Sequence, residues 1–283
     1  MEMNAMFWTD FYKVGHINQY PKGIKKVYSN LTARTSRLNG VNEVVVFGYT
    51  HLIKDFIMDY FQKNFFDKPK EEVVNSYKSE ITMALNTEDF DTTHIERLHD
   101  LGYLPIVIKA LPEGTLAPIR VPFITIENTI DEFFWVTNYI ETIFSAIIWQ
   151  PITSATIAFE YRKIVDKYFA ETGSDEMEWF KDFQCHDFSF RGMGGRESAC
   201  TSGMGHLTSF MGTDTLPAII CAKQYYNEDG FVGGSVGATE HSVMTSSAKI
   251  YAEKINEIIE ECSNKEDAYE KIMELVENPN LIL

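Results

Sequence analysis

Three consecutive segments in the second half of the chain share one order of elements, and this order constrains the fold more than any other feature. Each has a short strand-like run, a loop containing glycine or polar residues, and then a helical run. The three segments cover Phe183–Phe210, Gly212–Tyr226 and Val232–Glu261. Strands that alternate with helices are typical of parallel α/β folds. The last residues, Asn280–Leu283, resemble the beginning of a further strand.

The first half of the chain has a different pattern, which predicts an α+β domain over residues 1–149, followed by a second domain over residues 150–283. A Pro-Glu-Gly turn at residues 112–114 separates two strand-like runs, which we expect to pair antiparallel. Residues 68–101 are charged and loosely helical, which indicates a solvated excursion. The predicted strands are Lys26–Leu31, Glu43–Phe47, Leu104–Ala110 and Val121–Ile126, and the predicted helices are Tyr49–Phe65, Asp131–Trp149 and Ser154–Glu171.

Composition excludes several classes of function. The chain has 25 Lys+Arg against 41 Asp+Glu, a formal net charge of −16, which argues against a nucleic-acid partner. No apolar run reaches the length of a membrane span, and the opening residues do not form a secretion signal. The four cysteines show no CxxC spacing, as expected for reduced thiols in the cytoplasm. These features predict an acidic cytoplasmic protein that handles small molecules.

Chemically active residues follow the predicted parallel strands. In parallel α/β folds, ligand sites form on the loops after the strands. The residues at these positions are Asp187, Phe188, Arg191, Asp214, Glu240 and His241. They are the candidate site residues that the topology selects.

Two of these residues have both a functional and a structural interpretation. Arg191 lies in a glycine-rich loop before a helix, an arrangement that suits a phosphate or carboxylate, although an ion pair with a neighbouring acid would explain it equally well. Asp214 precedes a helix, where either Asp214 or Thr215 would serve as an N-cap. A carboxylate at a strand end would otherwise accept a hydrogen bond from a substrate N–H.

The remaining candidates are also open to two interpretations. His241 begins the last long helix, where the helix dipole favours a neutral, nucleophilic imidazole, and Glu240 is a candidate to orient it. The alternative is an exposed histidine without a role. Phe188 is either a core aromatic or a flat ring available for stacking. The histidines show no HxH or HExxH spacing, so no catalytic zinc is expected.

Four motifs together resemble the nicotinamide phosphoribosyltransferase family. They are DFYKVGHINQYP at Asp10–Pro21, HDFSFRG at His186–Gly192, GTDT at Gly212–Thr215 and SVGATEHS at Ser235–Ser242. Their order matches along nearly the whole chain, and four motifs in order are far more specific than any one alone.

The resemblance implies an enzyme that transfers the phosphoribosyl group of 5-phosphoribosyl-1-pyrophosphate to nicotinamide, giving nicotinamide mononucleotide and pyrophosphate in NAD salvage. Phe188 would stack on the pyridine ring opposite Tyr12 of a second subunit in a homodimer, and Asp214 would accept the carboxamide N–H. Arg191, with the partner's Arg34, would hold phosphate, and Asp187 would belong to the substrate site. The family also implies substrate-bound Mg²⁺ and ATP as an optional coupling substrate that phosphorylates His241.

Two further expectations follow from the resemblance. A carboxylate at position 214 attracts an amide and repels nicotinate, which favours nicotinamide as the substrate. Family members continue past the length of this chain through units that close an α/β barrel, so we expect only the first part of that barrel here and a truncated or split protein. The alternatives are a non-catalytic nicotinamide-binding or dimerisation module that needs a complementing chain, and a nicotinate phosphoribosyltransferase.

Overall fold

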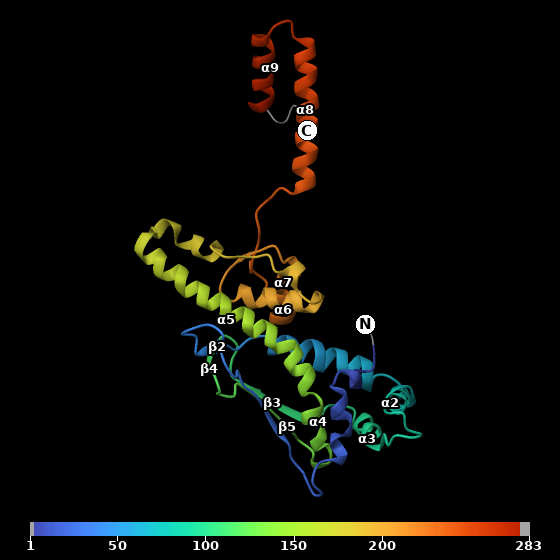
Figure 1. Ribbon diagram of the computed structural model, residues 1–283. Coiled ribbons are helices and arrows are strands. Elements are labelled where there is room, and N and C mark those ends of the chain that lie inside the picture. Colours follow the sequence, from blue (N-terminus) through green and yellow to red (C-terminus); the bar gives the residue numbers. More distant parts are fainter. Residues whose placement is uncertain (1–2, 278–283) are drawn as a thin grey trace. The chain divides into compact units, whose positions relative to one another are not determined.

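The computed structural model describes residues 3–277 (Figure 1). The chain forms two compact units, Met1–Ser235 and Val236–Leu283, which are described separately. The predicted domains, 1–149 and 150–283, divide the chain differently, and this division stays a prediction.

Two small antiparallel sheets form the strand framework of the N-terminal part. β1 (Tyr28–Leu31), β5 (Ile124–Asn128) and β3 (Ile106–Ala110) make a sheet in the order β1-β5-β3, with Ser29 opposite Ile126 and Ile108 opposite the same residue. β2 (Glu43–Val45) pairs with β4 (Leu116–Pro118). The predicted strands and the antiparallel pairing across the Pro-Glu-Gly turn are confirmed. In the sequence, however, β4 lies between β3 and β5, the two strands that pair.

Helical elements pack against these sheets. The helical elements up to residue 139 are η1 (Ala5–Phe7), η2 (Phe11–Asn18), α1 (Tyr49–His51), η3 (Leu52–Tyr60), η4 (Gln62–Phe66), α2 (Lys70–Leu85), α3 (Thr93–Leu101), η5 (Asp131–Phe133) and α4 (Phe134–Tyr139). α1, η3 and η4 follow one another closely, the latter two with wide π-type turns, and they confirm the helix predicted over residues 49–65.

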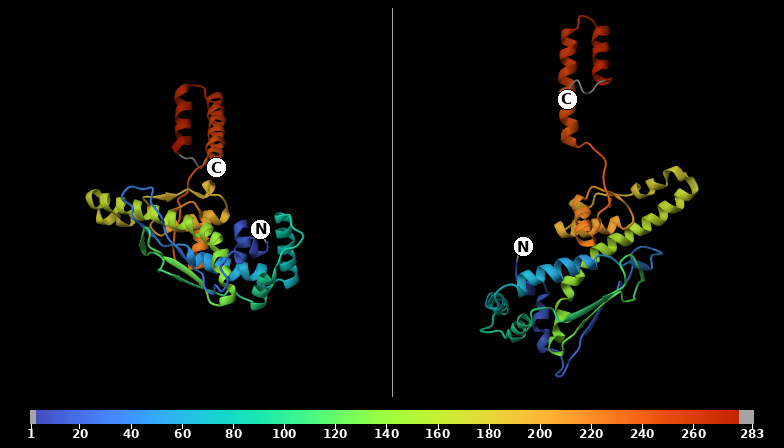
Figure 2. Two further views of the ribbon diagram at one scale, coloured as in Figure 1. Left: turned by 60° about the horizontal axis from the view of Figure 1, so that its bottom comes forward. Right: turned by 180° about the vertical axis from the view of Figure 1, so that it is seen from behind.

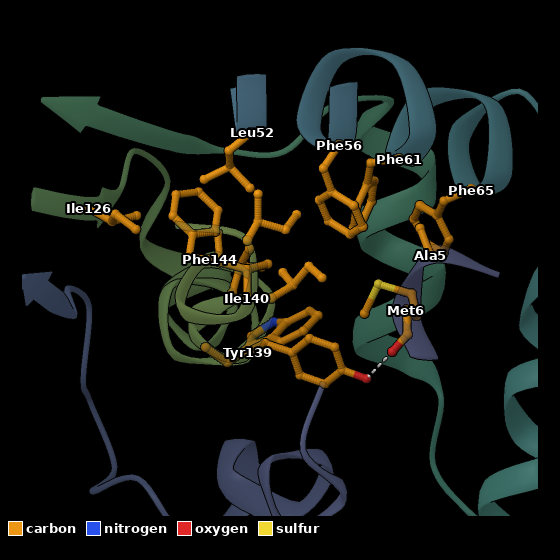
Figure 3. Close-up of a cluster of buried hydrophobic side chains, with 14 of the residues drawn as sticks. Ala5, Met6, Leu52, Phe56, Phe61, Phe65, Ile126, Tyr139, Ile140 and Phe144 are labelled. Carbon is orange, nitrogen blue, oxygen red and sulfur yellow. Dashed lines mark hydrogen bonds between the residues drawn. The ribbon is translucent and has the colours of Figure 1, made fainter. Parts of the chain in front are cut away.

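Large apolar side chains fill the core of the N-terminal part (Figure 3). Leu52, Phe61 and Phe65 are almost completely buried. The Tyr139 hydroxyl donates a hydrogen bond of 2.7 Å to the carbonyl oxygen of Met6, and its oxygen lies 3.0 Å from the hydroxyl of the buried Tyr77. Burial raises the pKa of Tyr77 to about 12, so both phenols remain neutral donors and satisfy each other inside the core.

The segment predicted to be a solvated excursion instead belongs to this core. α2 buries Val73, Tyr77 and Ile81, and α3 buries Ile95 and Leu98, all at helical spacing. The charged residues occupy the outer faces of the same helices, which obscured the apolar stripe in the sequence. The prediction of a solvated segment is therefore wrong, while the helical character is confirmed.

The helices predicted at Asp131–Trp149 and Ser154–Glu171 are not separated near residue 150. The first begins as η5 and α4, and one long helix, α5 (Glu141–Thr172), then runs through that point. Pro151 lies inside it, and two glycines approach it there from different parts of the chain. A Cβ on Gly48, which has a φ of +96°, would lie 2.5 Å from the Pro151 ring, and one on Gly205 would lie 2.7 Å from the Pro151 carbonyl oxygen. Glycine at both positions therefore permits close packing against the helix.

α5 is the one helix among residues 3–277 with the length and composition of a membrane span. Half of its most apolar window is buried inside the protein. It packs against β2 and against α6 (Arg196–Leu207), and it runs between the N-terminal sheet and the pair of helices α6 and α7 (Leu216–Tyr226) (Figures 1 and 2). The same properties are typical of a core helix in a water-soluble fold.

The parallel strands predicted in the second half are present but very short. β6 (His186–Asp187) pairs in parallel with β7 (Gly212–Thr213), and Gly212 forms a parallel bridge to Gly234. The long strand expected at Phe183–Phe190 is wrong, since its ends belong to the 3₁₀ helices η6 (Asp175–Phe183) and η7 (Phe190–Gly192). Of the run Val232–Thr239, only Gly234 joins the sheet. A second apolar cluster, which includes Ala155, Met204 and Ala218, packs α5, α6 and α7 together.

Up to residue 277, the second unit contains two helices, α8 (His241–Glu261) and α9 (Lys265–Glu277). α8 confirms the predicted last long helix, whereas α9 was not predicted. The expected strand at Asn280–Leu283 lies outside the described residues.

Candidate functional site

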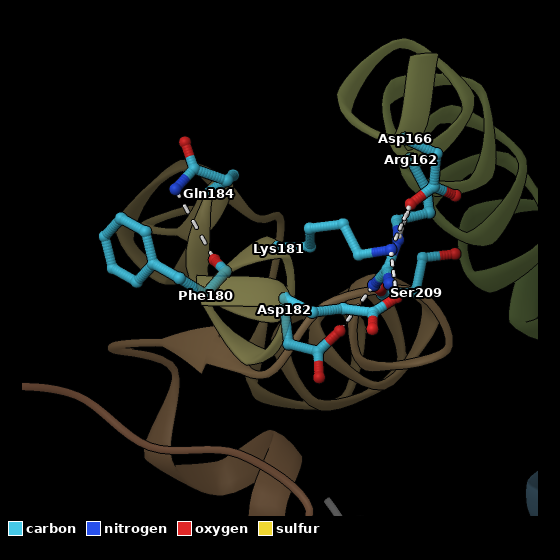
Figure 4. A network of polar contacts seen from close by, with 8 residues as sticks. Arg162, Asp166, Phe180, Lys181, Asp182, Gln184 and Ser209 are labelled. Atoms are coloured by element: carbon cyan, nitrogen blue, oxygen red, sulfur yellow. Dashed lines mark hydrogen bonds and ion pairs between the residues drawn. The ribbon is translucent and has the colours of Figure 1, made fainter. Parts of the chain in front are cut away.

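An ionic network fixes the segment that leads into β6 (Figure 4). Arg162 of α5 donates to Asp182 at 2.6 Å, to the carbonyl oxygen of Ser209 at 3.0 Å and to Asp166 at 3.0 Å. Asp182 lies in η6, just before β6, and Ser209 lies just before β7. The guanidinium therefore ties the approaches to both strands to α5, and this positions the strand ends.

The first two parallel strand ends bring two predicted acids close together. The backbone N–H of Asp214 donates to the carbonyl oxygen of Asp187 at 2.9 Å, and Thr213 donates to the carbonyl oxygen of Gly234 at 2.9 Å. The loops after β6 and β7 consequently open on one side of the sheet, as the topology predicts.

An open groove of about 1000 Å³ lies at these loops. It is lined by Phe188, Phe190, Arg191, Met193, Gly195, Arg196, Asp214 and Thr215. Three of the residues selected from the sequence, Phe188, Arg191 and Asp214, therefore share one groove, and its volume is large enough for a ligand of the size of a nucleotide.

Phe188 presents a flat ring to this groove. Its side chain is 68% exposed, so the core interpretation of this residue is wrong. Its ring centroid lies 4.6 Å from that of His186, with an angle of 35° between the planes. An exposed aromatic ring with one neighbouring ring is well suited to stack on a planar ligand.

Asp214 does not cap the following helix with its side chain. Thr215 is the N-cap residue of α7, and no side chain bonds to the first N–H groups there. The Asp214 carboxylate instead accepts a hydrogen bond from the Ser235 hydroxyl and lies 3.5 Å from Nε2 of His186. The Ser235 hydrogen bond, and then the contact with His186, hold the pKa of Asp214 below its ordinary value. The group is thus an ionised acceptor at neutral pH.

His186 is a site residue that the sequence reasoning did not select. Its ring lies beside Phe188, and its Nε2 faces Asp214, so it connects the stacking ring to the acceptor carboxylate. The available signal was its place in the strand itself, directly before the loop that carries Asp187 and Phe188.

Two arginines line the groove, of which the sequence reasoning identified only Arg191. Arg196 is the first residue of α6, directly after Gly194-Gly195, and this position after the glycines was the available signal. Among residues 3–277, the arginines that form ion pairs are Arg97 and Arg162, so Arg191 and Arg196 pair with no acid there. Two unpaired guanidinium groups make the groove a binding surface for anions such as phosphate.

Asp187 faces inward rather than into the groove. It is 8% exposed, and its Oδ1 accepts the backbone N–H of Ser189 at 3.0 Å. Burial raises its pKa, but polar groups of the loop, among them the backbone N–H of Ser189, outweigh burial, so the pKa lies below its ordinary value. These contacts shape the loop that holds Phe188.

Tyr12 and Arg34 do not line the groove of their own chain. Tyr12 belongs to η2, is 63% exposed, and has Lys13 Nζ 5.5 Å from its ring centroid. Arg34 is exposed in the loop after β1. Both residues are accessible, as their predicted contribution to a second subunit requires, and that contribution stays a prediction.

Glu240 and His241 belong to the second unit. Glu240 is the N-cap of α8, and its carboxylate accepts the backbone N–H of Ser242 at 2.9 Å and also the Ser242 hydroxyl. These bonds hold the pKa of Glu240 below its ordinary value. His241 is exposed in the first turn of the helix. The carboxylate is thus engaged with Ser242, and its predicted role in orienting His241 stays a prediction.

Comparisons with known proteins give two family matches. Residues 4–108 match the nicotinamide phosphoribosyltransferase N-terminal domain, and residues 183–282 match the nicotinate phosphoribosyltransferase family. A solved structure of human nicotinic acid phosphoribosyltransferase superposes with a TM-score of 0.54 at 19% identity, covering 84% of this chain and 40% of that one. This likeness confirms the mixed α/β fold. The chain corresponds to only part of the neighbour's structure.

Curated relatives are similar over most of this chain. A nicotinamide phosphoribosyltransferase of Acinetobacter baylyi is 48% identical over 86% of the chain and 48% of the relative. One of Xanthomonas campestris is 33% identical over 86% of the chain and 49% of the relative, and one of Mycoplasma genitalium is 33% identical over 83% and 52%. The chain thus spans about half the length of the curated relatives it matches. The resemblance drawn from the motifs is confirmed: over most of its length the chain is similar to nicotinamide phosphoribosyltransferases.

Proposed function

We propose that the chain acts in phosphoribosyl transfer from 5-phosphoribosyl-1-pyrophosphate to nicotinamide, which gives nicotinamide mononucleotide and pyrophosphate. The observation that carries the proposal is the groove in which an exposed ring, an ionised carboxylate and two unpaired guanidinium groups meet. The named relatives and the four sequence motifs support the same reaction.

In this reaction the lone pair of the pyridine nitrogen forms a bond to C1 of the ribose, while the bond from C1 to the pyrophosphate oxygen breaks and its electrons leave with pyrophosphate. Phe188 would stack on the ring and orient the nitrogen. Asp214 would accept the carboxamide N–H, which nicotinate lacks. Arg191 and Arg196 would neutralise the phosphate groups and favour departure of the leaving group.

The groove does not by itself offer a protein-held Mg²⁺ site. Its lining contains one carboxylate, Asp214, which is bonded to Ser235. Mg²⁺ is usually held by one or two carboxylates together with substrate phosphates and water. We therefore propose that Mg²⁺ enters as part of the pyrophosphate substrate, and no step of the reaction depends on a metal ligand from this groove.

We further propose that the active protein is a cytoplasmic homodimer. The exposure of Tyr12 and Arg34 supports this, since both would reach the groove of a partner chain. His241, at the start of α8, would receive phosphate when ATP is coupled to the reaction, with Glu240 beside it.

The first test measures nicotinamide mononucleotide formation by the purified chain, with its mass in solution measured alongside. Turnover supports the enzyme and eliminates the non-catalytic module. Saturable nicotinamide binding without turnover supports a module that requires a second chain, since this chain spans about half of its relatives. Absence of both turnover and binding contradicts both proposals.

The second test addresses substrate choice, because one family match names nicotinate. Asp214→Asn removes the negative charge, so the preference for nicotinamide over nicotinate should fall by roughly tenfold or more. Asp175→Asn, an exposed aspartate in η6, is the matched control. An unchanged ratio in Asp214→Asn would refute the role assigned to this carboxylate.

A further inference from the structure

Three potential metal ligands meet between two parts of the chain, the continuous helical segment α1–η3 and the first turn of α6. His51 ends α1, Asp55 follows one turn later in η3, and Glu197 lies in the first turn of α6. One ring nitrogen of His51 and one carboxylate oxygen from each acid all lie within 4.8 Å of one another. The cluster does not include the residues that line the groove.

The imidazole of this cluster is buried without a partner. His51 is 3% exposed, and its Nδ1 has no hydrogen-bond partner among the described residues. A buried polar atom without a partner is costly and calls for a ligand. An imidazole nitrogen is the commonest ligand atom for transition metals in proteins.

The two carboxylates also lack a cation. Within the described range, neither Asp55 nor Glu197 forms an ion pair, and the nearby Lys54 ammonium instead donates to the backbone carbonyl of Tyr225. Two carboxylates so close together without a cation form a local excess of negative charge.

Tyr225 contacts two of the three ligands, Asp55 and His51. Its hydroxyl donates to Oδ1 of Asp55 at 2.5 Å, and its ring lies edge-on to His51, with centroids 4.5 Å apart and an interplanar angle of 75°. Such outer contacts orient the ligands in metal sites. Glu197 is exposed, so an ion can enter from solvent.

We propose that His51, Asp55 and Glu197 bind a divalent transition-metal ion of the Zn²⁺ class. One nitrogen and two carboxylate oxygens form a donor set that zinc accepts, with water completing the coordination, and metal–ligand bonds of about 2.0–2.2 Å would draw the three groups slightly together. Because the ligands come from two separate segments, the ion would act as a structural link between the N-terminal helices and α6.

The test measures Zn²⁺ affinity by competition with a chromogenic chelator and thermal stability with and without Zn²⁺, on the whole chain under reducing conditions. We expect one ion per chain and a higher Tm with Zn²⁺, because binding to the folded state alone stabilises it. Mg²⁺ should produce no comparable shift, since it prefers oxygen ligands. Failure of Zn²⁺ to bind at micromolar concentration would overturn the proposal.

Three substitutions locate the site. His51→Gln, Asp55→Asn and Glu197→Gln should each weaken Zn²⁺ binding by about tenfold or more and remove the Tm increase. Glu197→Gln keeps the proposal testable if the buried His51→Gln variant fails to fold. Asp59→Asn, one turn further along the same helix and ion-paired with Lys63, is the control and should bind normally. Binding that survives all three substitutions would contradict the assignment.

Discussion

The N-terminal core and the region of α6 and α7 are packed in opposite ways. The first is filled with large side chains, such as Tyr77, Phe61 and Phe65. The second brings helices together through small residues: Ala199 and Ala218 are fully buried, and Gly203 lies against Ala218. The ring of Phe188 in this region remains exposed at the groove, whereas Phe210 is buried. The comparison indicates that stability is concentrated in one region, while close helix contacts in the other position the binding groups.

The largest effect should come from emptying the N-terminal core. Phe61→Ala removes a ring that is 2% exposed and should destabilise the protein by about 3–5 kcal/mol, as measured by urea unfolding. Met58→Ala, on the same helical segment but 65% exposed, is the control and should change stability by less than about 0.5 kcal/mol. If Phe61→Ala and Met58→Ala changed the free energy of unfolding equally, burial in this core would not be a main source of stability.

A pH-dependent contribution should come from the same core. Burial lowers the pKa of His94 from 6.5 to about 4. Between these values the unfolded chain binds a proton that the folded chain does not. The contribution of neutral His94 to the free energy of unfolding is therefore fully present above pH 6.5 and is lost as the pH drops towards 4. The loss approaches about 3 kcal/mol.

His94→Phe tests this dependence, because it keeps the edge contact with Trp135 and removes the titration. Urea unfolding across this pH range should show a flatter profile in the variant. His99→Phe is the matched control and should retain the slope. If the free energy of unfolding fell equally with pH in the wild type and in His94→Phe, the pH dependence would come from other groups.

A smaller effect on stability, with a larger one on binding, is expected in the second region. A Cβ on Gly203 would lie 2.5 Å from that of Ala218 and 3.2 Å from Oδ2 of Asp187. Gly203→Ala should therefore cost about 1–3 kcal/mol and displace β6 with its loop, which lowers nicotinamide affinity. Calorimetric binding and urea unfolding measure both effects. Gly230→Ala, where a Cβ meets nothing within 4 Å, should be neutral in both.

The smallest effect on stability should come from the groove itself. Phe188→Ala removes a ring that is 68% exposed and should change stability by less than about 0.5 kcal/mol. Nicotinamide affinity should fall several-fold through loss of stacking. Tyr103→Ala, 51% exposed elsewhere, provides the comparison for binding. Strong destabilisation by Phe188→Ala would remove the distinction between the two regions.

Elements with clear local patterns could be predicted from the sequence. The antiparallel strands, the helix from residue 49 and α8 follow from periodicity and turn residues, and the loop positions after parallel strands correctly brought Phe188, Arg191 and Asp214 to one groove. The predictions failed where tertiary contacts decide. The helix continues through Pro151, where glycines 48 and 205, distant in the sequence, pack closely against it.

Residues that depend on distant contacts were missed for the same reason. His51 and Glu197 are far apart in the sequence, and no spacing rule connects them, although they lie within 4.8 Å with Asp55. Arg196 differs from Arg191 only in lying after the glycines rather than before them, and the fold places both in the groove.

The length of α5 has a consequence for folding. At about 1.5 Å per residue its 32 residues extend roughly 48 Å, and Ile148 at one point contributes to the large apolar cluster while Ala155, two turns later, contributes to the small one. Val45, the last residue of β2, also belongs to the small cluster. The small cluster therefore depends on residues of the N-terminal part, and α5 contributes to both clusters. Residues 3–235 should melt in a single cooperative transition, so that a substitution that destabilises the aromatic core also loosens the groove lined by Phe188.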